Sequence, residues 1–315
     1  MIKLDLITGF LGAGKTTFLK HYGEYLVSKG EKICIIENDF GAINIDMVLL
    51  KELEGPQCNL EMVIGGDGPE AHKRRLKTKL ISMAMLGFSR VIIEPSGVYD
   101  VDEFFDLLYE EPIDKWYEAG NVIAVLNPKQ NENLTVNSRY LLMAEAAQAG
   151  MIVLSRSEQC SLEEKEKAIN QLNDAFSEFG CNRIIRPKDI IDKPFTSLDI
   201  SDFEKIIICG FNRYNHVKMP IFDTGEYQTL FYFDFKMDKA EIIDQCRKVF
   251  DDNGCGVVHR IKGIIQTDAG DFYELNTTRN EIMTKAVIKT RPVLIVIGEN
   301  LNRDNLAKYL GEPTL

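Results

Sequence analysis

Glycines near the start of the chain are spaced to hold phosphate. The run GFLGAGKT, residues 9–16, fits G-x-x-x-x-G-K-[ST] and lies between an apolar segment, 3–8, and an amphipathic one, 15–29. Glycine lets successive backbone N–H groups turn inward around an anion, and a helix that follows adds the positive end of its dipole. The motif therefore predicts a site for a nucleoside phosphate between a strand and a helix.

The side chains of this loop have separate expected roles. Lys15 is expected to reach the β- and γ-phosphates, Thr16 to ligate Mg²⁺, and Thr17 to contact the α-phosphate. The backbone N–H groups that complete the cradle belong to Gly12, Ala13 and Gly14.

Composition limits the classes of partner. Of 315 residues, 45% are hydrophobic and 27% charged, as in ordinary soluble globular proteins, and the formal net charge is −11. This charge argues against a nucleic-acid partner bound through a basic surface and against docking on anionic lipid. No apolar run has the length of a membrane span, and the first residues lack a signal-peptide pattern, so we expect a cytoplasmic protein. The seven cysteines form no C-x-x-C pair and are expected to be free thiols.

Short apolar runs alternate with amphipathic stretches over the first two thirds of the chain. This pattern predicts an α/β fold, a P-loop NTPase with a parallel sheet and helices on both faces. Strands are expected at 3–8, 32–37, 61–64, 90–94, 121–126, 151–154 and 183–186. Helices are expected at 15–29, 70–87, 101–109, 138–147, 162–179 and 202–209.

The remainder of the chain has a different rhythm. Residues 1–209 are predicted to form the P-loop domain, residues 210–227, rich in Asn, Pro and Tyr, a linker, and residues 228–315 a small α+β domain. In this last domain strands are expected at 230–235, 257–266, 271–274, 285–288 and 293–297, and helices at 239–250 and 303–310.

Four segments resemble the CobW family of metallochaperone GTPases, relatives of the urease and hydrogenase accessory GTPases. They are TGFLGAGKTT (8–17), ENDFGAINID (37–46), VIIEPSG (91–97) and RPVLIVIGENLNRDNLAKYL (291–310). The second resembles the family's N-E-F-G-x-x-x-I-D switch segment, the third its Walker B sequence, and the fourth the end of its small C-terminal domain. The resemblance spans nearly the whole chain and implies a GTPase that binds GTP or GDP.

The resemblance also implies roles for residues that match its motifs. Glu94, at the end of a buried strand, would hold Mg²⁺ through water or orient the attacking water. Asp39 stands where the family has Glu and would reach the same magnesium shell or water. Gly97 would bring a backbone N–H to the γ-phosphate. Asp46 is expected to be a helix cap.

A third signal is the loop that would recognise the base. Guanine-specific P-loop proteins normally end a late strand with N-K-x-D, and the matching strand end here reads SRSE, residues 155–158. Ser155 keeps a polar orienting group, Arg156 a cation able to stack on the base, and Glu158 the carboxylate. A longer carboxylate held less rigidly discriminates less well, so we expect a guanine preference that is not strict. The alternative is a polar loop with no special role.

The family's C-x-C-C metal motif is missing. At the corresponding place the chain keeps a glycine pair and continues with Asp67, Glu70 and His72. In one interpretation these three form an oxygen- and nitrogen-donor site for a transition metal such as Mn²⁺ or Fe²⁺, or for Mg²⁺. In the other, Asp67 and Glu70 form a capping box at the start of a helix, and His72 lies on the helix surface.

The sequence as a whole predicts a GTP-binding protein with slow Mg²⁺-dependent hydrolysis, because no arginine finger is evident in cis. By resemblance it would act as a switch or chaperone for a client metalloenzyme or a cofactor-loading protein. Two alternatives stay open: a metal carrier that uses the carboxylate and histidine site, and an ATP-using P-loop kinase or ATPase. The client, the metal and the oligomeric state, a homodimer included, are also open.

Overall fold

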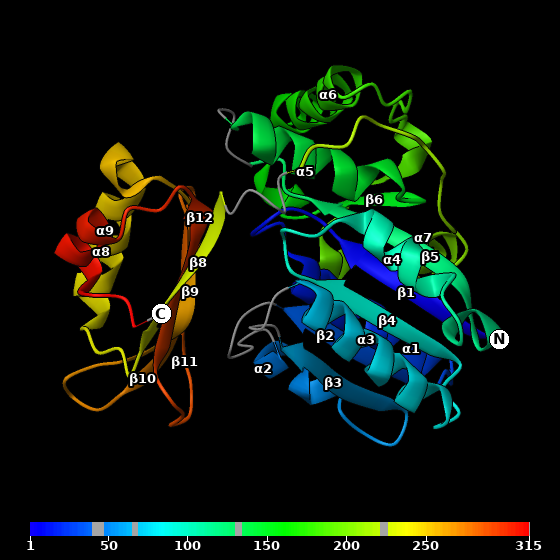
Figure 1. Ribbon diagram of the computed structural model, residues 1–315, viewed down its shortest axis with the longest axis horizontal. Helices are drawn as coiled ribbons and strands as arrows, with labels where there is room; N and C mark the ends of the chain where they lie inside the picture. Colours follow the sequence, from blue (N-terminus) through cyan, green and yellow to red (C-terminus); the bar gives the residue numbers. More distant parts are fainter. Residues whose placement is uncertain (40–46, 65–68, 130–133, 221–225, 315) are drawn as a thin grey trace. The chain divides into compact units, whose positions relative to one another are not determined.

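The computed structural model contains two compact units, Met1–Met219 and Pro220–Leu315 (Figure 1). It describes residues 1–39, 47–64, 69–129, 134–220 and 226–314. Asp46 and Asp67 lie outside the described residues, as does the side chain of Asp39. The division between the units falls inside the predicted linker, residues 210–227, and the exact bounds of the two domains stay predictions.

A parallel sheet forms the centre of the first unit. Within the described residues its strand order is β3-β2-β4-β1-β5-β6-β7. The strands are β1 (Ile2–Thr8), β2 (Ile33–Asp39), β3 (Cys58–Ile64), β4 (Arg90–Pro95), β5 (Tyr117–Leu126), β6 (Met151–Leu154) and β7 (Ile190–Ile191). Every ladder between them is parallel, so their carboxyl ends meet at one edge of the sheet. The predicted fold class is confirmed.

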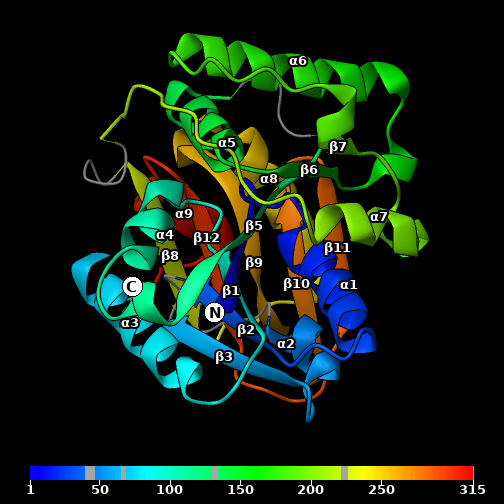
Figure 2. The same ribbon diagram turned by 90° about the vertical axis from the view of Figure 1, so that its right-hand side faces the viewer.

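Helices cover both faces of this sheet. Figure 2 shows α3 (Pro69–Ala84) and α4 (Val101–Leu108) on one face and α1 (Lys15–Ser28) and α7 (Ile200–Ile206) on the other. The other helices of the unit are α2 (Met47–Leu50), α5 (Val136–Ala147) and α6 (Leu162–Glu178). α1 is amphipathic, and its buried side chains Phe18, Tyr22 and Leu26 share one core cluster with the strands.

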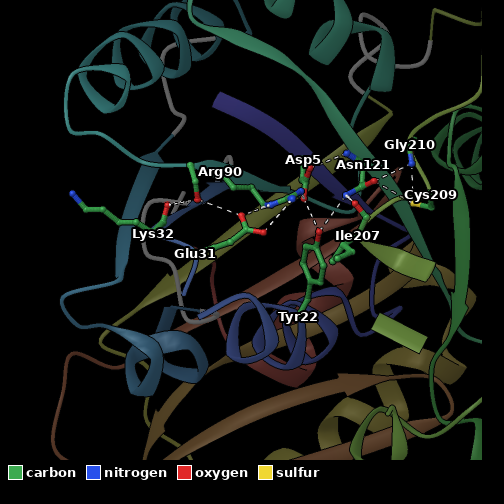
Figure 3. Close-up of polar contacts among 10 residues, drawn as sticks. Asp5, Tyr22, Glu31, Lys32, Arg90, Asn121, Ile207, Cys209 and Gly210 are labelled. Carbon is green, nitrogen blue, oxygen red and sulfur yellow. Dashed lines mark hydrogen bonds and ion pairs between the residues drawn. The ribbon is translucent and has the colours of Figure 1, made fainter. Parts of the chain in front are cut away.

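A buried polar network joins α1 to three strands (Figure 3). Asp5 of β1 accepts hydrogen bonds from Arg90 Nη1 of β4 at 2.7 Å and from the Tyr22 hydroxyl of α1 at 2.7 Å. The backbone N–H of Asn121, in β5, donates to the other oxygen of Asp5 at 2.8 Å. The Asp5 and Arg90 side chains are 0% and 4% exposed, so the charge of Asp5 depends on Arg90 for compensation, whereas Arg90 also pairs with Glu31 at 3.1 Å. The network therefore fixes α1 relative to the strands whose far ends carry the phosphate loop and Glu94.

The strand predicted at 183–186 is wrong. In the structure the edge strand is the short β7, and the chain before it is irregular. Arg183 is buried, and its guanidinium donates to the carbonyl oxygens of Ala146 and Ala147 at the end of α5. Of its two apolar residues, Ile184 is exposed and Ile185 is buried, and the Ile185 N–H donates to the Asn173 side chain of α6 and not to a strand. α7 also begins before the predicted residue 202, because Asp199 caps it and accepts from the N–H groups of residues 201 and 202.

The second unit is a small α+β module. Its antiparallel sheet has the order β11-β10-β9-β12-β8 among the described residues. The strands are β8 (Tyr227–Phe233), β9 (Val257–Gln266), β10 (Phe272–Thr278), β11 (Glu281–Ala286) and β12 (Val293–Glu299). α8 (Lys239–Asp251) and α9 (Arg303–Leu310) bury one apolar core with the strands.

The hairpin β10–β11 is longer than predicted. Thr278 pairs with Glu281, so only Arg279 and Asn280 form the turn. The ends of these strands were not predicted because residues 276–281 are polar. The alternation of apolar and polar residues stops before the β10–β11 pairing ends. Among the described helices of both units, none is long and apolar enough to cross a membrane.

Candidate functional site

The phosphate loop connects β1 to α1 at the carboxyl edge of the parallel sheet. Gly9 has φ 141°, and a Cβ at this position would lie 2.3 Å from the carbonyl oxygen of Val125 in β5. Gly14, with φ 97°, precedes the first residue of α1. Both positions require glycine, because a side chain would clash at the first and strain the backbone at the second. The loop and helix N-terminus thus have the arrangement that the motif predicts.

Lys15 lies folded over this loop. Its side chain is buried, and Nζ donates to the carbonyl oxygen of Gly9 at 2.7 Å. The backbone N–H of Ala13 donates to the carbonyl oxygen of Phe10 at 3.0 Å. An ammonium group that is bound to a carbonyl oxygen of the loop is placed where phosphate oxygens would compete for its hydrogen bonds. The roles given to Gly12, Ala13 and Thr17 stay predictions.

Thr16 and Glu94 meet beside the loop. The Thr16 hydroxyl, in the first turn of α1, donates to Glu94 Oε1 near the end of β4 at 2.8 Å. Both residues are buried, at 8% and 5% exposure. A hydroxyl and a carboxylate are hard oxygen ligands, so this pair fits a Mg²⁺ ion. β2, which ends at Asp39, is the neighbour of β4 in the sheet.

Gly97 brings the segment after β4 against the phosphate loop. A Cβ at Gly97 would lie 2.6 Å from the backbone nitrogen of Leu11. Only glycine permits this approach. The backbone of Gly97 therefore lies beside the phosphate loop, and its predicted contact with the γ-phosphate stays a prediction.

The base loop also contacts the phosphate loop. Arg156, in the left-handed conformation with φ 51°, donates from Nη1 to the carbonyl oxygen of Gly12 at 3.3 Å. Ser155 is buried, and its Cβ would be 3.4 Å from a Cβ placed on Gly14. Glu158 is exposed in the short turn that follows. Ser155 and Arg156 are therefore brought to the phosphate loop, whereas Glu158 lies at the solvent side.

The sequence analysis did not single out Asp192, which follows β7. The Ser157 hydroxyl donates to the Asp192 carboxylate, and Lys165 Nζ lies 2.8 Å from the same carboxylate. This contact ties the base loop to the end of the neighbouring strand. No local motif marks Asp192, since its position follows from the pairing of β6 with β7.

Two buried polar residues precede Asp39 in β2. Glu37 and Asn38 are 3% and 1% exposed and pair in register with Glu94 and Pro95 of β4. Neither amide atom of Asn38 has a hydrogen-bond partner among the described residues. Both residues belong to the ENDFG segment, so the signal was present in the motif that supplied Asp39.

Glu145 is a further buried carboxyl group, on α5. It is 1% exposed. Burial raises the pKa of Glu145 well above its ordinary value, and the positive charge of Lys15 opposes this shift. The signal in the sequence was a single acidic residue within the run LLMAEAA, residues 141–147.

The structure corrects the interpretation of His72 as a residue of the helix surface. His72 is 3% exposed, because α3 buries the stripe formed by residues 72, 76, 80 and 83. Glu70, in the first turn of the same helix, is exposed. Among the described residues no group of three or more His, Cys, Asp or Glu side chains could hold a metal ion. The second metal site and its capping alternative both require Asp67 and stay predictions.

Comparison with known proteins assigns the family. Zinc chaperones YeiR and YjiA of Escherichia coli K12 are 27% and 26% identical to this chain over 167 and 171 residues. These alignments cover 53% and 52% of this chain and 50% and 52% of the relatives, so the chain spans about half the length of the curated relatives it matches.

Solved structures of similar proteins include Zn(II)-bound YjiA GTPase from E. coli, at 16% identity and a TM-score of 0.36 over 98% of this chain and 97% of that one. Another is the hydrogenase maturation factor HypB from Archaeoglobus fulgidus, at 15% identity and a TM-score of 0.41 over 65% and 87%. The model of the CobW/HypB/UreG nucleotide-binding domain matches residues 4–179, more than half of the chain. This match covers the phosphate loop, the Thr16–Glu94 pair and the base loop, and the chain therefore belongs to the CobW/HypB/UreG family.

Proposed function

We propose that this protein binds GTP with Mg²⁺ and hydrolyses it slowly, and that the nucleotide state controls metal delivery to a client metalloprotein. The observation that carries the proposal is the Thr16–Glu94 hydrogen bond beside a glycine loop covered by Lys15. A hydroxyl, a carboxylate and an ammonium group around one anion cradle are the groups that triphosphate hydrolysis requires.

In this mechanism the residues of the site bind the phosphates, hold the ion and orient the attacking water. Lys15 neutralises charge on the β- and γ-phosphates, and the backbone at Gly97 donates to the γ-phosphate. Thr16, Glu94 and Asp39 are the residues that would hold Mg²⁺. When bound, this ion would supply positive charge against the negative charge of the phosphates. Water attacks the γ-phosphate in line, oriented by Glu94 or Asp39.

Slow turnover is part of the proposal. Arg156 donates to the phosphate loop, but it comes from the base loop and its contact is the Gly12 carbonyl oxygen. A switch GTPase without an arginine at the γ-phosphate turns over slowly until a partner supplies one. A partner that completes the site would therefore accelerate hydrolysis.

Metal delivery is supported by the relatives YeiR and YjiA, both described as zinc chaperones. This chain lacks the C-x-C-C run, so thiolates at that place do not hold an ion here. A carried ion would instead be bound by oxygen and nitrogen donors, which favour Mn²⁺ or Fe²⁺ over softer ions.

The test is nucleotide binding by Lys15→Ala. We expect the variant to lose measurable affinity for a fluorescent GTP analogue, while Lys29→Ala, an exposed lysine at the end of the same helix, retains it. Competition with unlabelled GTP and ATP, with and without EDTA, measures base preference and the need for Mg²⁺. Unchanged GTP affinity in Lys15→Ala contradicts the proposed site. Tighter binding of ATP than of GTP contradicts the base assignment and favours a P-loop kinase or ATPase.

A further inference from the structure

The outer edge of β3 is open along its middle. β3 ends the sheet order, and β2 is the one strand that pairs with it within the described part of the chain. At the start of β3, Cys58 forms an isolated bridge with Gly55. α3 follows β3 in the chain and packs next to it, as Figure 2 shows. An edge strand beside a helix is the arrangement with which several domains bind extended peptides, because the strand supplies backbone hydrogen bonds and the helix contacts the side chains.

A groove of about 730 Å³ lies between this edge and the helix. This volume falls within the range of about 300–1,000 Å³ typical of ligand sites. Its strand wall is Met62, Val63 and Ile64, and its helix wall is Arg74, Arg75, Thr78, Lys79 and Ser82. Residues 75, 78, 79 and 82 have the i, i+3, i+4, i+7 spacing of one helix face, so this face is turned along the groove.

The groove is positively charged in an acidic protein. It is lined by three cationic side chains and by no acidic one, whereas the whole chain has a net charge of −11. Arg74 is exposed and forms no ion pair with any residue that the structure describes. Lys79 pairs with Glu61 at 2.7 Å, and both side chains are partly exposed, so a stronger acceptor could replace this partner at little cost.

The Arg75 side chain forms a hydrogen bond with the backbone of β3. Its Nη1 donates to the carbonyl oxygen of Ile64, the last residue of β3, at 2.8 Å. The carbonyl oxygen of Ile64 therefore faces outward from the edge of β3 and accepts a hydrogen bond there, as it would from an added strand. The guanidinium lies at the end of the groove, where it could contact a carboxylate and the edge together.

We propose that this groove binds an extended acidic segment of a partner protein, which adds a strand to β3 and directs its carboxylates toward Arg74 and Arg75. Apolar residues Met62 and Ile64 supply contacts for alternate side chains of that segment. A peptide can form backbone hydrogen bonds with the edge of β3 and a nucleic acid cannot, so the strand edge favours a peptide. This docking surface does not depend on the proposed GTP hydrolysis.

The test uses a fluorescein-labelled octapeptide of alternating Glu and Val, whose anisotropy reports binding to the full chain. A Lys-for-Glu counterpart tests the charge, and a version N-methylated at alternate backbone nitrogens tests strand addition. We expect both changed peptides to bind at least about tenfold more weakly, since each loses charge-assisted or backbone hydrogen bonds. Amide exchange at residues 62–64 is expected to slow when the Glu–Val peptide is bound.

Matched variants decide where the peptide binds. The double variant Arg74→Glu with Arg75→Glu is expected to bind the Glu–Val peptide about tenfold or more weakly than the unchanged protein does. Lys188→Glu with Lys205→Glu, two exposed lysines elsewhere in the unit, makes the same change in net charge and should alter affinity by less than about twofold. Thr78→Trp, which fills the groove without changing its charge, should also abolish binding. Unchanged GTP affinity and circular dichroism show that each variant is folded.

Three results would overturn the proposal. One is an affinity for the Glu–Val peptide no greater than for its Lys counterpart. Another is peptide binding without slower amide exchange at residues 62–64. The third is tighter binding of single-stranded oligothymidine that the Arg74 and Arg75 changes remove, which would identify a nucleic-acid site instead.

Discussion

The Thr16 hydroxyl donates to Glu94 Oε1 at 2.8 Å, although 78 positions separate the two residues in the chain. The contact joins the first turn of α1 to the end of β4. It exists because β1, which leads into the phosphate loop, is the direct neighbour of β4 in the sheet. A residue named by the phosphate motif and one named by the Walker B segment are therefore parts of one site.

Removal of the Thr16 hydroxyl should impair hydrolysis more than folding. Thr16→Ala is expected to lower the GTP turnover rate by about a hundredfold or more, because one preorganised group at the reacting phosphate is lost. Thr16→Ser keeps the hydroxyl and serves as the control. Turnover measured against Mg²⁺ concentration gives the answer. Equal magnesium dependence in the two variants would mean that Thr16 is not a ligand.

Glu158 is expected to recognise the base. Glu158→Ala should reduce the preference for GTP over ATP by about tenfold, the value of a hydrogen bond to a charged group. Glu163→Ala, which removes an exposed carboxylate in the first turn of α6, is the control. The two affinities are measured by competition against one fluorescent nucleotide. An unchanged ratio in Glu158→Ala would show that the exposed carboxylate does not contact the base, and Asp192 would become the residue to test.

The buried Asp5–Arg90 pair should contribute strongly to stability. Arg90→Met is expected to lower the free energy of unfolding by about 3–5 kcal/mol, because Asp5 would be left charged and buried. Lys115→Met breaks an exposed pair with Glu111, whose side chains are 60% and 74% exposed, and should cost less than about 1 kcal/mol. Urea unfolding of both variants measures the difference. Similar decreases in unfolding free energy in the two variants would mean that burial does not determine how much each ion pair contributes.

Glu103 should make stability depend on pH between pH 4.5 and about 7. Burial raises the pKa of Glu103 to about 7 from its ordinary 4.5, and the negative charge of Asp100 adds to this shift. The folded state therefore binds the proton more tightly than the unfolded state, so the contribution of Glu103 to stability falls as pH rises between these two values.

Glu103→Gln removes this titration. We expect the unfolding free energy of the unchanged protein, relative to the variant, to fall from pH 4.5 to about 7 and then to stay constant. A difference between Glu103→Gln and the unchanged protein that does not vary with pH would contradict the raised pKa.

Much of the fold and part of the site could be predicted because the signals are local. The phosphate loop depends on glycines within eight consecutive residues, and alternating apolar and amphipathic runs predict a parallel sheet. The prediction failed where neighbouring apolar residues do not pair as a strand, at 183–186, and where polar residues continued a strand, in β10. In both places the local pattern was ambiguous and contacts distant in sequence decided the outcome.

The sequence by itself determined that the chain has a phosphate loop, an α/β domain of the CobW type and no cysteine run for metal. Only the tertiary structure decided that Thr16 meets Glu94, that Arg156 reaches Gly12, and that His72 and Glu145 are buried. The physical reason is that a motif constrains neighbours along the chain through backbone geometry. Which distant side chains meet, and which lose their water, depends on strand order and on helix packing across the sheet.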